Sequence, residues 1–295
     1  MSERICIGIF GTTIREEHIN KFRHLIETLL NKNAELIFYK PFADSCINNE
    51  LLNKNCSTFS STEDLVKNFT QFVISIGGDG TFLDAIPFIN DSLIPITGIN
   101  FGKLGFLTLI DENELESSLN DLLNQKFEVE HRSLLKIQSE TGISYPFALN
   151  DISFKSEKLE LLNIDVYIDG MFLNTYFGDG LIISTPTGST AYSLSCGGPL
   201  LPPENKNFII TPIASHTLTV RPLVIPETSK IEVRISGEEP SFFTMLDSKR
   251  FLFTGKHNFL IEKAPFCVNT IRLNSHSFFD AIRNKLMWGF DIRKK

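Results

Sequence analysis

The sequence predicts two domains of different class: an α/β domain with a parallel sheet, followed by an antiparallel β domain. In the first part of the chain, short apolar runs typical of strands alternate with segments of helical period. In the second part helical periods are nearly absent and strand-like runs follow one another. At 295 residues the chain has the length of one large or two ordinary domains. We therefore expect an α/β domain over 1–130, a β domain over 131–272, and a C-terminal helix within 273–295 that packs on the first domain or on a partner.

The first domain is expected to alternate strands and helices, which places the strands side by side in parallel. Ile19, Phe22, Leu25 and Leu29 recur at the spacing of one helical face. The expected strands are 4–10, 34–39, 72–76 and 94–99, and the expected helices lie near 18–30, 62–68 and 112–124. In such sheets ligands bind where the carboxyl ends of the strands meet.

The second domain is expected to consist of strands, with one helix near its end. Leu162, Ile164 and Val166 alternate with polar residues, as in a half-buried strand. Asp169-Gly170 then predicts a type I′ hairpin. The expected strands are 134–139, 146–154, 161–168, 171–176, 181–184, 208–213, 231–235, 242–246, 251–254 and 259–262, followed by a helix over 279–288.

Composition excludes several classes of protein. A net charge of −7 and a pI near 5.5 argue against a nucleic-acid-binding protein, which is usually basic. No apolar run approaches the ~20 residues that cross a bilayer, so we expect no membrane segment. The charged start leads directly into a strand without a signal-peptide pattern, which predicts a cytoplasmic protein. The five cysteines are scattered and the six histidines lack ligand spacing, so neither a disulfide framework nor a zinc site is expected.

The glycine-rich turn after the strand 72–76 is the strongest single signal. Its residues are Gly77, Gly78, Asp79, Gly80 and Thr81, and helical spacing resumes after them until Pro87. A strand, a glycine turn and a helix start present backbone N–H groups to a phosphate. The turn matches neither the P-loop nor the Rossmann fingerprint. The alternative is an ordinary tight turn in which Asp79 is the N-cap of a helix.

Other polar segments follow neighbouring strands. Asn100 to Phe106, with two glycines, directly follows the strand 94–99 and would form the opposite wall of one cleft, unless it is an ordinary glycine turn. Thr185 to Ser193 is rich in hydroxyls and glycine, which favours a bound polar ligand over a surface linker. Within it Tyr192 could stack on a heterocycle. Asn150 and Asp151 would serve one ligand only if their strand bends or ends there, and they could instead form a turn.

Together these segments resemble the NAD kinase family. The resemblance covers most of the chain, in the family's order and spacing: Gly77 to Thr81, Asn100 to Thr108, Asn150-Asp151, and Gly178 to Pro199. The GGDGT turn alone also looks like the phosphate loops of 6-phosphofructokinases and of diacylglycerol and sphingosine kinases. The TPTGSTAYSLSCGGP stretch is similar to NAD kinases in particular.

The resemblance implies ATP-dependent phosphorylation of NAD at the adenosine 2′-hydroxyl, which gives NADP. It implies an α/β domain, a β-sandwich-like domain, a cleft between them, and a homodimer or homotetramer. Asp79 would act as general base, and a divalent metal cation, most simply Mg²⁺, would be held mainly by the ATP phosphates, although Asp79 could instead bind that metal. The residues implied for NAD binding are Asp79, Gly80, Asn150, Asp151, Asp179, Thr190, Ala191, Tyr192, Ser193, Leu194 and Ser195, and those of the phosphate loop are Gly77, Gly78, Gly80 and Thr81.

The chain departs from the family pattern at several positions. Asn150-Asp151 stands where the family usually has Asn-Glu, and Lys249 follows Asp247 where the family usually has Gln. Leu161 and Phe177 occupy places that are often basic. A lipid or sugar kinase with the same glycine turn and a non-catalytic NAD(P) sensor are the alternatives. Acceptance of NADH, use of polyphosphate, oligomer size and allosteric control are left open.

Overall fold

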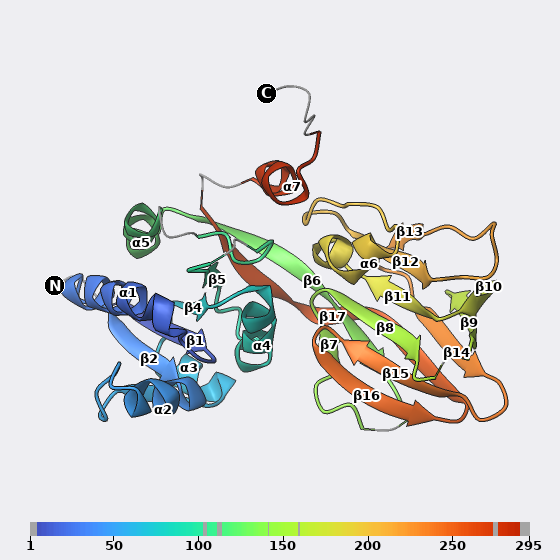
Figure 1. Cartoon of the computed structure of the whole chain (residues 1–295), viewed down its shortest axis with the longest axis horizontal. Coiled ribbons are helices and arrows are strands. Elements are labelled where there is room, and N and C mark those ends of the chain that lie inside the picture. Colours follow the sequence, from blue (N-terminus) through green and yellow to red (C-terminus); the bar gives the residue numbers. More distant parts are fainter. Residues whose placement is uncertain are drawn as a thin grey trace. The chain divides into compact units, whose positions relative to one another are not determined.

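The computed structural model of the chain describes residues 5–102, 105–110, 114–140, 142–158, 160–273 and 277–289. It divides into two compact units (Figure 1). Unit 1 contains Met1–His131 and Val268–Lys295, and unit 2 contains Arg132–Cys267. Two long strands, β6 (Glu128–Gln138) and β17 (His257–Arg272), run from one unit into the other.

Unit 1 contains a parallel sheet in the order β5-β4-β1-β2-β3, which confirms the predicted α/β class. The strands are β1 (Cys6–Gly11), β2 (Glu35–Tyr39), β3 (Ser57–Phe59), β4 (Phe72–Ile76) and β5 (Ile96–Ile99). The chain leaves β1 toward β2 on one side, while β4 lies on the other side of β1. The strand order therefore reverses between β1 and β4, where Gly11 and Ile76 are paired at the strand ends. Open α/β sheets bind ligands at such a switch point.

Helices cover both faces of this sheet. Their bounds are α1 (Ile19–Asn31), α2 (Lys40–Asn48), α3 (Thr62–Lys67), α4 (Asp79–Ile89) and α5 (Leu115–Leu123), with a 3-10 turn η1 (Glu16–His18) before α1. Unit 1 also contains the C-terminal helix α7 (Phe278–Leu286). Apolar residues of α1, α2 and α5 share one core with Ile7 and Ile9 of β1. Phe10 faces the other side, where its ring lies 5.5 Å from that of Phe88 in α4. Because alternate side chains of β1 point to opposite faces of the sheet, the strand packs against helices on both faces.

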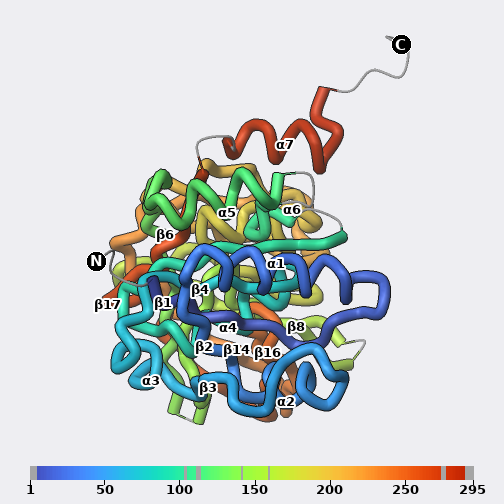
Figure 2. The backbone as a smooth tube through the Cα atoms, turned by 90° about the vertical axis from the view of Figure 1, so that its left-hand side faces the viewer, coloured from blue at the N-terminus to red at the C-terminus, as the bar shows by residue number. Residues whose placement is uncertain are grey.

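Helices α1 and α5 lie side by side on one face (Figure 2). His24 Nε2 lies 3.3 Å from Glu116 Oε1, and Lys32 Nζ donates to Asn120 Oδ1 at 3.2 Å. These surface contacts flank the shared apolar seam, which supplies the larger part of the packing energy because exposed ion pairs contribute little.

In unit 1 the structure corrects two details of the expected elements. The segment after the second strand contains α2 and β3, which periodicity did not reveal. Helix α4 continues through Pro87 to Ile89, although the sequence predicted an end at Pro87. A proline near the end of a helix loses only one intrahelical hydrogen bond, and the buried side chains of Ile86 and Ile89 favour continuation. Arg4 and Glu112, the predicted starts of a strand and a helix, lie outside the described residues.

Unit 2 consists of two antiparallel sheets with one core between them, as expected for a β-sandwich-like domain. One sheet follows the order β10-β9-β14-β17, with β6 and β7 beyond β17, and the other follows β13-β12-β11-β8-β15-β16. The remaining bounds are β7 (Phe147–Ala148), β8 (Asp151–Ser156), β9 (Leu162–Ile168), β10 (Met171–Gly178), β11 (Gly180–Ser184), β12 (Asn207–Ile213), β13 (Leu223–Pro226), β14 (Ile231–Ser236), β15 (Ser241–Leu246) and β16 (Lys249–Thr254). The expected strand 146–154 is divided into β7 and β8, and β13 was not expected. The predicted hairpin turn is confirmed, because Asp169 and Gly170 both have positive φ, as a type I′ turn requires.

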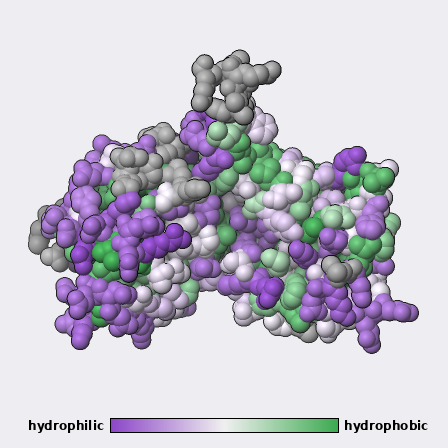
Figure 3. All heavy atoms as spheres, in the orientation of Figure 1, coloured by the Kyte–Doolittle hydropathy of each residue, from purple (hydrophilic) through white to green (hydrophobic). Residues whose placement is uncertain are grey.

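Hydrophilic side chains cover much of the face seen in Figure 3 over α1, α2 and α3. None of the helices in the described part of the chain is long and apolar enough to cross a membrane.

Candidate functional site

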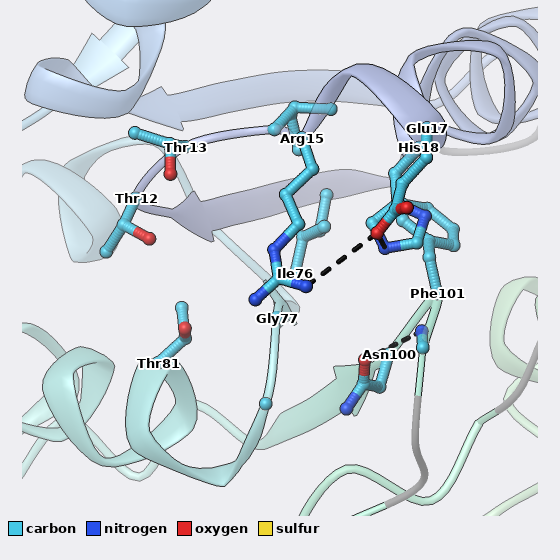
Figure 4. A pocket seen from close by; sticks show the side chains of 13 residues that line it. Thr12, Thr13, Arg15, Glu17, His18, Ile76, Gly77, Thr81, Asn100 and Phe101 are labelled. Atoms are coloured by element: carbon cyan, nitrogen blue, oxygen red, sulfur yellow. Dashed lines mark hydrogen bonds and ion pairs between the residues drawn. The ribbon is translucent and has the colours of Figure 1, made fainter.

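Unit 1 contains a polar cavity of about 590 Å³ at the switch point of its sheet (Figure 4). Its lining comes from the segments that follow β1, β4 and β5 at the carboxyl edge, in agreement with the rule for open α/β sheets. The lining residues are Thr12, Thr13, Ile14, Arg15, Glu17, His18, Ile76, Gly77, Gly78, Thr81, Asn100, Phe101 and Gly102. The volume lies in the range of small-molecule sites.

The glycine turn leads from β4 directly into α4. Gly77 has a φ of +148°, and a Cβ there would lie 2.4 Å from Thr81 Oγ1, so a side chain is excluded. The N–H of Gly77 donates to the carbonyl of Ile99 at 3.0 Å. This amide is therefore used by the sheet, contrary to the expectation that all N–H groups of the turn face a phosphate. The amides of the first turn of α4, which begins at Asp79, have no intrahelical acceptors and form an anion-attracting helix N-terminus.

Sequence reasoning missed two side chains in this cavity, the cationic Arg15 and the imidazole of His18. Arg15 follows β1, and Figure 4 shows its guanidinium reaching toward Gly77. Its Nη1 lies 3.7 Å from Glu17 Oε1, in a largely exposed pair that restrains the side chain weakly. His18 lies beside Phe101, with ring centroids 6.0 Å apart. The strand order alone could have indicated Arg15, because the loop after the first strand borders the switch point.

Asp79 binds the second glycine-bearing loop. Its Oδ2 accepts the N–H of Phe106 at 2.7 Å, and its Oδ1 accepts the N–H groups of Leu107 and Thr108 at 3.0 and 3.1 Å. The hydroxyl of Thr108 donates to the same Oδ1 at 3.0 Å. A Cβ on Gly105 would lie 1.7 Å from that oxygen, so only glycine fits there. We call this arrangement the Asp79 clamp.

The structure tests one of the two interpretations of the glycine turn, the N-cap role of Asp79. The two loops do meet, as expected for walls of one site. The N-cap of α4 is Gly78, and no side chain caps this helix end, so the simple N-cap role of Asp79 is wrong. Lys103 and Leu104, in the middle of the second loop, lie outside the described residues.

In unit 2, the hydroxyl-rich segment forms short buried turns. Its elements are the 3-10 helix η2 (Thr187–Thr190) and the short helix α6 (Tyr192–Ser195). Thr185 Oγ1 donates to the carbonyl of Leu149 at 2.5 Å and accepts the N–H of Gly188 at 3.1 Å. A Cβ on Gly188 would lie 2.1 Å from the carbonyl oxygen of Asn150. A surface linker would not be fixed in this way.

The same contacts bring the Asn150-Asp151 pair to this segment. Asn150 lies in a bend and Asp151 is the first residue of β8, so the strict alternation of a strand does not apply to the pair. Burial and then the nearby charges of Cys196, Asp151 and Asp179 raise the pKa of the Tyr192 phenol. Asp151 and Asp179 thus lie near enough to Tyr192 to influence it electrostatically.

The remaining predicted residues of this segment differ in their environment. Asp179 is exposed between Gly178 and Gly180, where a Cβ on Gly180 would lie 2.0 Å from a backbone carbonyl oxygen. The Ser193 hydroxyl is buried and hydrogen-bonded to Thr211 Oγ1 at 2.8 Å, so it holds the segment to β12. Ser195 is exposed, and Thr190, Ala191 and Leu194 are partly exposed. Ser193 can thus contact a ligand through its backbone more readily than through its hydroxyl.

Asp247 binds the segment around Asn150 in the same way as Asp79 binds the loop after β5. Its carboxylate accepts the N–H groups of Leu149, Asn150 and Asp151 at 2.9, 2.7 and 3.2 Å. It lies in the turn between β15 and β16 with a φ of +52°. Burial raises the pKa of Asp247 to about 6, although these three amides and Lys249 oppose the shift. Burial and the charge of Asp247 raise the pKa of Asp151 to about 8.

Comparison with known proteins identifies a family that shares this architecture. Residues 7–127 match the ATP-NAD kinase N-terminal domain, and residues 149–273 match the ATP-NAD kinase C-terminal domain. The chain is 38% identical to a NAD kinase of Cytophaga hutchinsonii over 290 residues and 39% identical to one of Flavobacterium psychrophilum over 292, covering 97% of this chain and 99% of each relative. A NAD kinase from Archaeoglobus fulgidus in complex with ATP matches with a TM-score of 0.72 and 25% identity over 95% of this chain and 99% of that one. Yeast NADH kinase complexed with NADH shares the fold, with a TM-score of 0.85 and 24% identity over 99% of this chain and 90% of that one.

These matches show that the fold is that of a class of nucleotide-dependent phosphotransferases. The chain belongs to the ATP-NAD kinase family. The predicted NAD kinase activity, with ATP as the family's phosphoryl donor, is confirmed at the level of the family. The lipid or sugar kinase and the non-catalytic sensor receive no support from these relatives.

Replacing Gly105 with alanine should break the Asp79 clamp, because the added methyl group cannot fit beside Oδ1. We expect kcat to fall by about 10²-fold, the effect of a small misplacement at a reacting centre. Gly142→Ala is the matched control, since its Cβ would meet nothing within 4 Å. Steady-state kinetics and thermal unfolding of both variants measure this. Equal activity of the two variants would contradict the role of the clamp.

Asp151 should make folding stability fall as pH rises. Its pKa is about 8 in the folded protein against 3.8 ordinarily, so between about pH 4 and pH 8 the folded state keeps a proton that the unfolded state has released. Asp151→Asn should flatten this slope by up to about 1.4 kcal/mol per pH unit. Denaturant unfolding at several pH values measures the slope, with the exposed Glu238→Gln as control. A wild-type slope in Asp151→Asn would show that Asp151 is ionised in the folded protein.

Proposed function

We propose that the cavity in unit 1 binds the phosphates of ATP and that Asp79 acts as the general base on the adenosine 2′-hydroxyl of NAD. The observation that carries this proposal is the position of Asp79 at the N-terminus of α4, between Gly78 and Thr81, which line a polar cavity of about 590 Å³ at the switch point. The helix N-terminus and the Arg15 guanidinium supply the positive potential that a triphosphate needs. The archaeal relative that matches this fold was solved in complex with ATP.

The chemistry follows from the free capacity of the carboxylate. A carboxylate oxygen accepts about two hydrogen bonds. Among the described residues, Oδ1 of Asp79 accepts three and Oδ2 accepts one. Oδ2 can therefore accept the proton of the 2′-hydroxyl while that oxygen forms its bond to the γ-phosphorus and the bond to ADP breaks. The clamp fixes the carboxylate beforehand, so no reorientation is needed during the reaction.

A divalent cation, Mg²⁺ by preference, is proposed to accompany ATP. No group of three or more His, Cys, Asp or Glu side chains gathers into a metal site within the described ranges. The cation is proposed to be held mainly by ATP phosphates and water, which is the usual mode for Mg²⁺. Such a cation neutralises charge on the phosphates when bound.

The acceptor is proposed to bind through unit 2. Tyr192 would stack on the adenine ring, and Asn150 and Asp151 would bond the ribose or adenine of NAD. Asp179 would contact the nicotinamide end or a neighbouring ribose. The backbone of the segment Thr190, Ala191, Tyr192, Ser193, Leu194 and Ser195 would form the adenine pocket, and Gly80 would let the substrate approach α4 closely. A buried Asp151 that keeps its proton at neutral pH could donate a hydrogen bond as well as accept one.

A homodimer or homotetramer in the cytoplasm is the proposed state of the protein. Met171 and Phe172 at the start of the edge strand β10 are 71% and 57% exposed. Apolar side chains on a sheet edge favour self-association.

Asp79→Asn should lower kcat by at least about 10²-fold, the lower range for loss of a general base. Thr108→Val is the matched control, because it removes one donor to Oδ1 but keeps the carboxylate, and it should cost much less. The rate of NADP formation from NAD with ATP and Mg²⁺, measured with the binding of both substrates, separates the two effects. Near wild-type turnover by Asp79→Asn would remove it from the mechanism.

The two substrates should respond to different variants. Arg15→Met should raise KM for ATP by about 10-fold through loss of a charge-assisted contact, with KM for NAD nearly unchanged. Tyr192→Ala should raise KM for NAD by about 10-fold and leave KM for ATP nearly unchanged, since stacking of one base contributes about 1–3 kcal/mol. Initial rates with each substrate varied in turn test this pattern. If each variant raised both KM values by the same factor, the assignment of Arg15 to ATP and of Tyr192 to NAD would be wrong.

A further inference from the structure

The C-terminal helix α7 brings a lysine to the Asp79 clamp. The Nζ of Lys285 lies 4.4 Å from the centroid of the Phe106 ring, in a cation–π contact. The backbone N–H of Phe106 is itself one of the donors to Asp79. Lys285, Phe106 and Asp79 all belong to unit 1. A residue far along the chain thus reaches the loop that the proposed general base holds.

The ammonium group of Lys285 is directed inward without a hydrogen-bond acceptor. Its Nζ is buried, and no described group accepts from it. Lysines on protein surfaces usually extend their ammonium to water. An ammonium has three donors, and buried donors are nearly always satisfied by protein, water or ligand. A ligand with acceptor oxygens at this point would satisfy them.

Helix α7 is built to hold this side chain in place. Ser277 caps its N-terminus by accepting the N–H of Asp280 at 3.1 Å, and Ile282 is buried. The other cation of its last turns, Arg283, is exposed and paired with Asp280. Lys285 is therefore the cation of α7 that faces the clamp.

The charge of Lys285 responds to the same surroundings. Burial lowers its pKa to about 8, and the carboxylate of Asp79 opposes that shift. A lysine with this pKa still carries its positive charge at pH 7. Asp79 is close enough to act on this charge, yet the two make no hydrogen bond.

We propose that Lys285 is a phosphate-binding residue of the donor site, whose ammonium contacts the oxygens of the transferred phosphoryl group next to Asp79. This inference rests on the proposed function, in which the turn Gly77 to Thr81 holds the ATP phosphates. It supplies a cation that the glycine turn itself lacks, since no lysine follows the glycines as it does in a P-loop. Charge on the transferred group would be neutralised by Lys285 as well as by the helix N-terminus.

The test compares Lys285→Met, which removes the charge but keeps an unbranched apolar side chain, with Lys285→Arg, which keeps the charge. Arg283→Met removes an equal charge from the exposed face of the same helix and is the matched control. We expect Lys285→Met to lower kcat/KM for ATP by about 10²-fold, as for loss of one charge-stabilising donor, while KM for NAD changes less than about 2-fold. Lys285→Arg should recover most of the loss, and Arg283→Met should match the wild type.

A calorimetric titration of each variant with ATP and Mg²⁺, without NAD, completes the test. Weaker ATP binding by Lys285→Met alone supports the proposal even if turnover of the wild type were absent, an outcome that would overturn the proposed reaction instead. Unchanged ATP binding and unchanged kcat/KM in Lys285→Met would overturn the role of Lys285 and leave the proposed function standing. Equal losses for ATP and NAD, accompanied by a lower Tm, would show that Lys285 only supports the fold. No ATP binding by the wild type would overturn both.

Discussion

The hydrogen bonds between the Asp79 carboxylate and three consecutive backbone amides are the interaction on which the unit 1 site depends. They connect the N-terminus of α4 to the loop that follows β5. Without them the loop would have buried or partly buried N–H groups without acceptors, which is costly. Gly105 permits the close approach, and Phe106 in turn contacts Lys285 of α7. One carboxylate thereby positions segments from three distant parts of the chain.

In unit 2, Asp247 likewise provides acceptors for backbone N–H groups at the end of a strand. Its carboxylate accepts the three consecutive amides of Leu149, Asn150 and Asp151. A loop at a strand end cannot satisfy its amides through the sheet, and an aspartate has the reach and the acceptor capacity to do so. The consequence is a rigid peptide from which Asn150 and Asp151 extend. In both units a glycine then packs against the clamped segment, Gly105 in one and Gly188 in the other.

The carboxylates of Asp79 and Asp247 bind backbone amides in similar ways, but their surroundings differ. Asp79 lies between Gly78 and Thr81, which line a polar cavity of small-molecule size. Asp247 lies beside a second carboxyl, Asp151, and both have raised pKa values because burial disfavours charge. The proposed roles of the two sites, proton acceptance at Asp79 and nucleoside binding beside Asp151, follow from these surroundings.

The sequence by itself determined the α/β and antiparallel β classes, the I′ turn at Asp169-Gly170 and the glycine turn at Gly77 to Thr81, because these depend on local periodicity and on φ values that few residues adopt. It also indicated the hydroxyl-rich segment around Tyr192. Only the tertiary structure decided that the Gly77 amide belongs to the sheet, that Arg15 borders the cavity and that Asp247 and Lys285 act on segments far away in sequence. Strand order and side-chain reach across the fold set these contacts, and neither leaves a periodic or compositional trace in the chain.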